Sequence, residues 1–328
     1  MPRYRRVLTF GDVLDESIQV FRQHWVSFAV LSAVALLPPG LVAISLSASG
    51  VLSRTSGLFD FQNGRPVPTA ALSEEITTLF ASSLVSTLFF LLWTSVVVAA
   101  SDAVLRGAEP RLWPVYATAL RRYWAVFLAS LVIVVGLSVL TLIGSVLFVF
   151  TGFGVAGSLI ALVAVLVWWL RLRAGKSWVK WLIILAAPFG LPMYFLGRWS
   201  MFIPAVVLER HGPIGALRRS SQLVDRHWFR VVSILAVAGL IVAILQSAPA
   251  TLIEIPLTLR SATRGQIGFA PAEAAMVNAV AVILEILFAS IGSIVYTLLF
   301  VDLRNRREGA DIVERLSQLE TEPASTNG

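Results

Sequence analysis

Segment 76–100 of the chain reads ITTLFASSLVSTLFFLLWTSVVVAA, which is 25 consecutive residues without a charged side chain. A helix needs about 20 apolar residues to span the hydrocarbon core of a bilayer, so this stretch is typical of a transmembrane helix. Comparable apolar regions lie at about 26–48, 124–150, 157–208, 229–248 and 275–300. The sequence therefore predicts an all-α, polytopic membrane protein.

The composition of the whole chain agrees with this prediction. Of the 328 residues, 57% are hydrophobic and 14% are charged, whereas soluble domains carry about 25% charged residues. A soluble enzyme is therefore not expected. The absence of cysteine excludes disulfides and thiolate metal sites. The net charge of +7 is carried almost entirely by arginine, and in a membrane protein it indicates topology and contact with anionic lipid headgroups, not nucleic-acid binding.

A repeated motif precedes three of the apolar regions. It consists of a basic residue, then an aromatic residue or histidine, then a tryptophan, and it ends at Trp25, Trp124 and Trp228, which are 99 and 104 residues apart. At the far end of each unit an acidic residue leaves the membrane and is followed by arginine and glycine; these acids are Asp102, Glu209 and Asp302. We expect them to form cytoplasmic salt bridges or helix-end contacts between repeats.

These marks predict three tandem repeats within one transmembrane domain, 1–319. The units run over about 9–107, 111–212 and 213–309, and each consists of an interfacial amphipathic helix followed by a transmembrane hairpin. This gives six transmembrane helices in total. The polar residues 320–328 are expected to form a disordered tail.

The segments before the tryptophans are amphipathic at helical spacing, as a helix in the headgroup plane requires. In the third segment, one predicted face carries Ile214, Leu217, Val224 and Trp228. The opposite face is basic, and we expect contacts with anionic lipid phosphates from Arg218, Arg219, Arg226 and Arg230. In the first segment, Thr9 and Asp12 have the spacing of a capping box.

Two topologies fit the middle repeat. In the preferred one, 183–208 is the fourth crossing and 151–180 lies on the outer side; in the other, 157–170 crosses inward and 181–208 is a re-entrant loop. With the preferred layout, the inner segments hold 17 basic residues and the outer segments hold 8. Positive residues favour the cytoplasmic side, so both termini are predicted to lie in the cytoplasm. The protein itself is expected in the inner membrane of a bacterium.

One ionisable residue is predicted to lie inside the membrane. Glu285 falls near the middle of the sixth span, and Asn278, seven residues earlier, is expected on the same helix face. Such a group is costly in hydrocarbon unless it is neutral, paired or hydrated. It marks either a proton or substrate site or a hydrogen bond that holds the bundle together. Helix breaks are expected at Pro38-Pro39-Gly40 and at Pro204. Transporters use such breaks at their binding sites, but the same prolines also fit simple kinks.

Several motifs resemble a known family. They are Gly11-Asp12-Val13-Leu14-Asp15, Arg198-Trp199-Ser200, Gly212-Pro213-Ile214-Gly215-Ala216-Leu217-Arg218-Arg219-Ser220 and Asp302-Leu303-Arg304-Asn305-Arg306-Arg307-Glu308-Gly309-Ala310-Asp311. With them the chain resembles, over nearly its whole length, the bacterial and often actinobacterial proteins of the glycerophosphoryl diester phosphodiesterase membrane-domain-like family. Its name comes from members fused to a catalytic domain, which we do not find here. The resemblance implies a membrane domain of mostly unknown function.

The residue inventory argues against catalysis. A phosphodiesterase needs clustered carboxylates and histidines to hold a divalent metal, and this chain has only three histidines, His24, His211 and His227. We therefore expect no catalytic residue, no metal and no cofactor. The leading hypothesis is a non-catalytic scaffold or partner-binding module of the cell envelope, with membrane lipids and a membrane protein as partners. The alternatives are a lipid or small-molecule transporter that uses Glu285, and an accessory domain associated with a phosphodiesterase.

Overall fold

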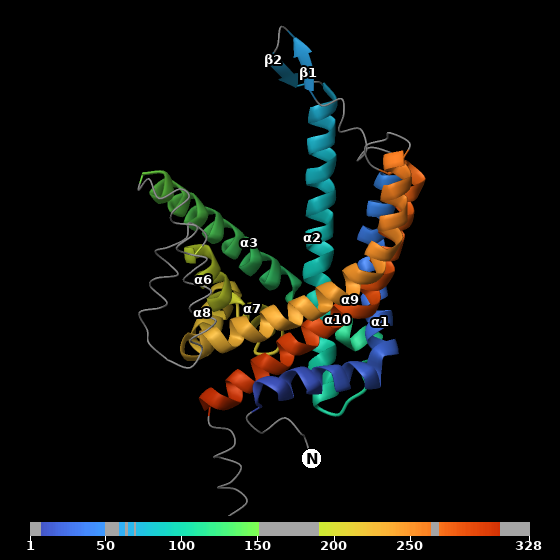
Figure 1. Cartoon of the computed structure of the whole chain (residues 1–328). Coiled ribbons are helices and arrows are strands. Elements are labelled where there is room, and N and C mark those ends of the chain that lie inside the picture. The colour runs from blue at the N-terminus through green and yellow to red at the C-terminus, as the bar shows by residue number, and fades with distance from the viewer. Residues whose placement is uncertain are drawn as a thin grey trace, which may run out of the picture. The chain divides into compact units, whose positions relative to one another are not determined.

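The computed structural model describes residues 8–49, 59–62, 65–68, 70–150, 190–263 and 269–308. In chain order the elements are α1 (Phe10–Ala48), β1 (Phe59–Gln62), β2 (Arg65–Pro68), α2 (Ala70–Leu105), α3 (Leu112–Phe150), α6 (Gly190–Trp199), α7 (Phe202–Val207), α8 (Pro213–Val224), the 3₁₀ turn η3 (Asp225–His227), α9 (Trp228–Thr263) and α10 (Pro271–Glu308) (Figure 1).

Within these residues, five helical stretches are long and apolar enough to cross a bilayer: α1, α2, α3, α10 and Pro213–Thr263, which contains α8, η3 and α9. The prediction of a helical, multi-pass chain is thus confirmed at this level. The predicted outer segment 151–180 and the start of the predicted fourth crossing, 183–189, lie outside the described residues. The part of this crossing that is described forms the short helices α6 and α7. The count of six crossings and the three-repeat arrangement remain predictions.

Two details differ from the prediction made from the sequence. The segment before α2 contains an antiparallel hairpin, in which Phe59 of β1 pairs with Pro68 of β2. The fifth span, expected to end near 248, continues as α9 to Thr263 through Pro249 and Pro256. Helices inside membranes tolerate proline when neighbouring groups satisfy the freed carbonyls.

The repeated tryptophan motif coincides with a change of direction in α1 and with a 3₁₀ turn in the third unit. In α1, His24 has non-helical angles (φ −126°, ψ 22°), and Figure 1 shows the helix turning sharply. In the third unit, η3 interrupts the helix directly before Trp228. By contrast, α3 runs through Trp124 as one helix. The capping box of Thr9 and Asp12 at the start of α1 is confirmed, whereas Pro38 and Pro39 lie inside a continuous helix.

The chain divides into two compact units, and the division falls inside α3 and α9. One unit holds the described residues up to Tyr123 and from Ser233 onward, and the other holds those of 124–232. The core of the first consists of α1, α2 and α10, with the most extensive packing between α1 and α10.

A small polar cluster joins the three helices of that core. The hydroxyls of Ser32 on α1 and Ser290 on α10 share a hydrogen bond of 2.8 Å, and the indole Nε1 of Trp93 on α2 donates to the Ser32 oxygen at 2.9 Å. Nearer the end of α1, a Cβ built on Gly40 would lie 2.7 Å from a methyl of Val282. Small residues let helix backbones approach closely in membranes, and here the approach requires glycine.

The second unit contains α6, α7 and α8, with α8 packed against both of the others. Ser220 of α8 accepts a hydrogen bond from the Met201 backbone nitrogen at 3.0 Å, and its own hydroxyl donates to the Arg198 carbonyl at 2.9 Å. The predicted break at Pro204 is misplaced. The chain leaves the helix at Ser200 and Met201, and Pro204 lies in the first turn of α7, where proline is tolerated.

Candidate functional site

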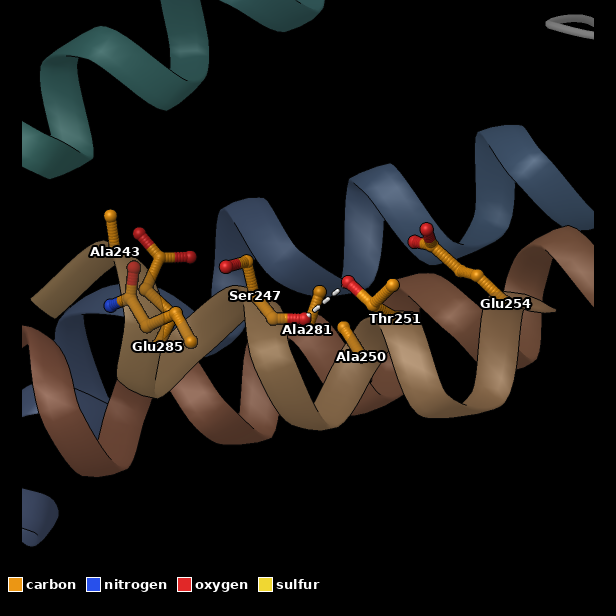
Figure 2. Close-up of a pocket in the computed structure, with 8 residues that line it drawn as sticks. Ala243, Ser247, Ala250, Thr251, Glu254, Ala281 and Glu285 are labelled. Atoms are coloured by element: carbon orange, nitrogen blue, oxygen red, sulfur yellow. Dashed lines mark hydrogen bonds between the residues drawn. The ribbon is translucent and has the colours of Figure 1, made fainter. Parts of the chain in front are cut away.

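A groove of about 420 Å³ lies between α9 and α10 and includes Glu285. From α9 it is lined by Ala243, Gln246, Ser247, Ala250, Thr251 and Glu254, and from α10 by Ala281 and Glu285. Figure 2 shows Glu285 and Glu254 at opposite ends of this row, with Ser247 and Thr251 between them. The Thr251 hydroxyl donates to the Ser247 carbonyl at 2.7 Å, so it is satisfied by its own helix.

The spacing of acidic residues along α10 predicts that Glu285 lies near the middle of the crossing. It lies 12 residues after Glu273 and 17 residues before Asp302, the acids near the two ends of the helix. At 1.5 Å per residue these separations are about 18 Å and about 25 Å. Their sum is close to the roughly 40–45 Å thickness of a bilayer with its headgroups. With these two acids at the two headgroup layers, Glu285 is predicted to lie within about 4 Å of the midpoint.

Contacts between α9 and α10 close the groove at its two ends. Toward one end, the position of a Cβ on Gly292 is 3.7 Å from a methyl of Val242. Toward the other end, Arg260 pairs with Glu273 at 3.8 Å. Between these contacts the lining includes three alanines, and Glu285 is only partly buried. A neighbouring molecule could therefore approach the two helices closely here and meet a carboxyl group.

Asn278 does not belong to the groove, although Glu285 lies two turns further along the same helix. Its side-chain nitrogen donates to the Ser47 hydroxyl of α1 at 2.7 Å and to the Ala274 carbonyl at 3.1 Å. Asn278 therefore fastens α10 to α1. Glu254 belongs to the part of α9 beyond the expected end of the fifth span near 248, and it lines the groove.

Each of the three repeated acidic residues forms an ion pair with an arginine. Asp102 pairs with Arg106 at 2.8 Å, a contact in which the arginine is 69% exposed. Asp302 is fully buried and accepts from Arg306 Nε at 2.8 Å. Its other oxygen accepts from the backbone nitrogen of Leu8 at 2.9 Å, and Arg306 also donates to the Leu8 carbonyl. Asp302 thus joins the end of the predicted third repeat to the start of the first.

The acid of the middle repeat makes the third such pair. Glu209 accepts two hydrogen bonds from Arg219, at 2.7 and 2.9 Å, and His211 Nε2 lies 3.2 Å from the same carboxylate. Arg219 was expected to contact lipid phosphate, but its guanidinium is engaged by Glu209 in a largely buried pair, 19% and 13% exposed. Between Glu209 and His211, Arg210 adopts left-handed backbone angles (φ 61°).

The other predicted lipid contacts lie on or next to α8. Arg218 and Arg226 are exposed, whereas Arg230, in the first turn of α9, is partly buried. Ile214, expected on the apolar face with Leu217, is 76% exposed. At 100° per residue it lies about 40° from Arg218 around the helix and about 60° from Leu217, on the side away from α6 and α7.

A network around Trp228 was not identified from the sequence. Its Nε1 donates to the Tyr194 carbonyl at 3.0 Å, and its ring stacks on that of Tyr194. Arg198 donates to the Tyr194 hydroxyl at 3.0 Å and pairs with Asp225 at 3.3 Å. A Cβ on Gly197 would lie 2.6 Å from the indole nitrogen, so α6 sits directly on this ring. The third tryptophan of the repeat is therefore a packing residue, while Trp25 and Trp124 are exposed.

No group of three or more histidine and acidic residues that could hold a metal ion is found in the part of the chain that the structure describes. The chain matches no family model, no curated protein and no solved structure. Its class therefore rests on its own features: the five long apolar helices among the described residues are those of a helical, multi-pass membrane protein.

Proposed function

We propose that this protein is a non-catalytic, membrane-embedded module that binds another membrane protein, and that the groove between α9 and α10 receives one transmembrane helix of that partner. The observation that carries the proposal is the placement of Glu285, partly exposed in a groove near the middle of the span. Lipid tails offer a carboxyl group no hydrogen bond, so the group is costly there without a polar partner.

The lining of the groove supports a helix as the occupant. Ala243, Ser247 and Ala250 are small residues on one face of α9, and Ala281 faces them from α10. Small residues allow close approach of a second helix, and a polar side chain on that helix can hydrogen-bond across the contact. A basic or hydroxyl-bearing side chain at mid-membrane would complement Glu285.

The setting proposed for this module is the bacterial cytoplasmic membrane with both termini inside, as the basic residues predict. The resemblance to the phosphodiesterase membrane-domain-like family supports a role in the cell envelope, including as an accessory to a phosphodiesterase. Enzymatic activity is not proposed, because the sequence offers no clustered histidines and carboxylates for such chemistry.

Site-specific photo-crosslinking in native membranes tests the proposal. A photoreactive residue at Ser247, inside the groove, should give a discrete protein adduct, whereas one at Leu252, which is 74% exposed on another face of α9, should not. Ala250→Leu fills the groove and should abolish the Ser247 adduct, while Leu252→Ala should leave it unchanged. Adducts with lipid alone, or equal adducts from both positions, would refute helix docking.

Transport is the second candidate, and one observation favours it. The polar groups Gln246, Ser247, Thr251 and Glu254 continue from Glu285 along α9 toward its C-terminal end. Such a row is what an ion or proton path from one membrane face would need. In liposomes containing an internal pH dye, a transporter should carry protons in the wild type and not in Glu285→Gln. Absence of flux in the wild type would leave partner binding as the supported function.

A further inference from the structure

We propose that the exposed face of α8 is a binding surface for anionic phospholipid headgroups, with Arg218 and Arg226 as its phosphate contacts. The four exposed residues of this row follow one another at four-residue spacing: Ile214, Arg218, Gln222 and Arg226. Residues four apart are neighbours on a helix surface, so the row forms one stripe. The proposal does not depend on the groove between α9 and α10.

The opposite face of α8 fixes the direction in which this stripe points. Ala216, Leu217, Ser220, Leu223 and Val224 are buried. Ser220 bridges the backbones of Arg198 and Met201, as described above, and so ties α8 to the end of α6 and the start of α7. The stripe is thus held outward by packing and by hydrogen bonds on the other side of the same helix.

The acidic residues near α8 already have basic partners, so the stripe carries an excess of positive charge. Glu209 is engaged by Arg219 through two hydrogen bonds, and Asp225 lies 3.3 Å from Arg198. Among the residues that the structure describes, Arg218 and Arg226 form no ion pair. Their complement is an anion from outside the chain.

The position of α8 along the chain selects a lipid headgroup over a free anion. Only η3 separates α8 from Trp228, where the membrane-length helix α9 begins. The stripe therefore lies at the level where the chain enters the bilayer. Ile214 adds an exposed apolar side chain to the same stripe, which suits the boundary between headgroups and acyl chains. Arginine side chains extend from such a boundary to the phosphates.

The test compares two double variants of the full-length protein that remove the same charge. One is Arg218→Gln/Arg226→Gln. The control is Arg106→Gln/Arg260→Gln, in which both arginines are exposed; Arg106 lies directly after α2 and Arg260 lies on α9. Short-chain phosphatidylglycerol is titrated into purified protein in neutral detergent, and binding is followed by native mass spectrometry. Each basic residue near an anionic surface is worth about 1 kcal/mol, so the α8 variant should bind roughly 30-fold more weakly, and the control much less so.

Three further measurements complete the design. Phosphatidylcholine should bind the wild type and the α8 variant equally, because its headgroup carries no net charge. Inorganic phosphate should not compete with the lipid; full competition would make the stripe a site for a free anion and overturn the lipid assignment. Both side chains are exposed, so the α8 variant should keep the thermal midpoint of the wild type without lipid. Equal loss of phosphatidylglycerol binding in both double variants would refute the proposal.

Discussion

Removing the carboxylate of Asp302 should destabilise the protein far more than removing that of Asp102, although both are aspartates with an arginine four residues on. Asp302 is fully buried and accepts hydrogen bonds from Leu8 and Arg306. Removing one partner of a buried ion pair costs about 3–5 kcal/mol. Arg306 retains some exposure to water, so Asp302→Ala should cost about 3 kcal/mol. For Asp102→Ala, whose arginine is exposed, about 0.3–0.5 kcal/mol is expected.

The assay is thermal unfolding of the purified variants in one mild detergent. Asp302→Ala should lower the midpoint clearly, and Asp102→Ala should hardly change it. The double variant Asp302→Leu/Arg306→Met should recover part of the loss, because replacing both members of a buried pair by apolar side chains avoids an uncompensated charge. Equal shifts for the two alanine variants, or a double variant less stable than Asp302→Ala, would refute the idea that burial of this pair decides its strength.

Three other predictions concern packing and topology. Gly40→Ala should lower the thermal midpoint because its Cβ would lie 2.7 Å from Val282, and adding Val282→Ala should restore it. Ser32→Ala leaves the buried indole donor of α2 without its acceptor and should cost about 1–3 kcal/mol of stability, measured by the same unfolding assay. In intact cells, an impermeant thiol reagent should label a cysteine at Arg54 and not one at Ala108; the reverse pattern would invert the predicted orientation.

Hydropathy predicted the membrane-length helices of this fold well, because such helices are apolar along most of their length. It located the five membrane-length helices found among the described residues, but it ended the one that begins at Trp228 near 248, because Pro249 and Glu254 are residues typical of a loop. The hairpin of β1 and β2 had a local signal that was overlooked, since Asn63-Gly64 is a dipeptide typical of two-residue turns. The tryptophan motif coincides with the start of a helix only at Trp228; in α1 the change of direction falls one residue before Trp25, and α3 continues through Trp124.

The candidate site was only partly predictable, because a sequence fixes the composition of a helix face and not what that face meets. Glu285 stands out as a carboxyl group in an apolar run, but its neighbours on α9 depend on how that helix is rotated about its axis. Asn278 has nearly the same angular position on α10 and contacts α1 instead. The bond between Asp302 and Leu8 joins residues 294 positions apart, which no local pattern can indicate.

The packing of α1 against α10 has a consequence for biosynthesis. About 220 residues separate the end of α1 from the start of α10, so at roughly 5–20 residues per second the ribosome needs about 10–45 s to supply the partner of the first helix. During that time the face of α1 that Val282 and Ser290 will cover remains in contact with lipid or with the insertion machinery. A chain truncated before α10 keeps that face open permanently, and we expect such fragments to be degraded instead of accumulating as a smaller bundle.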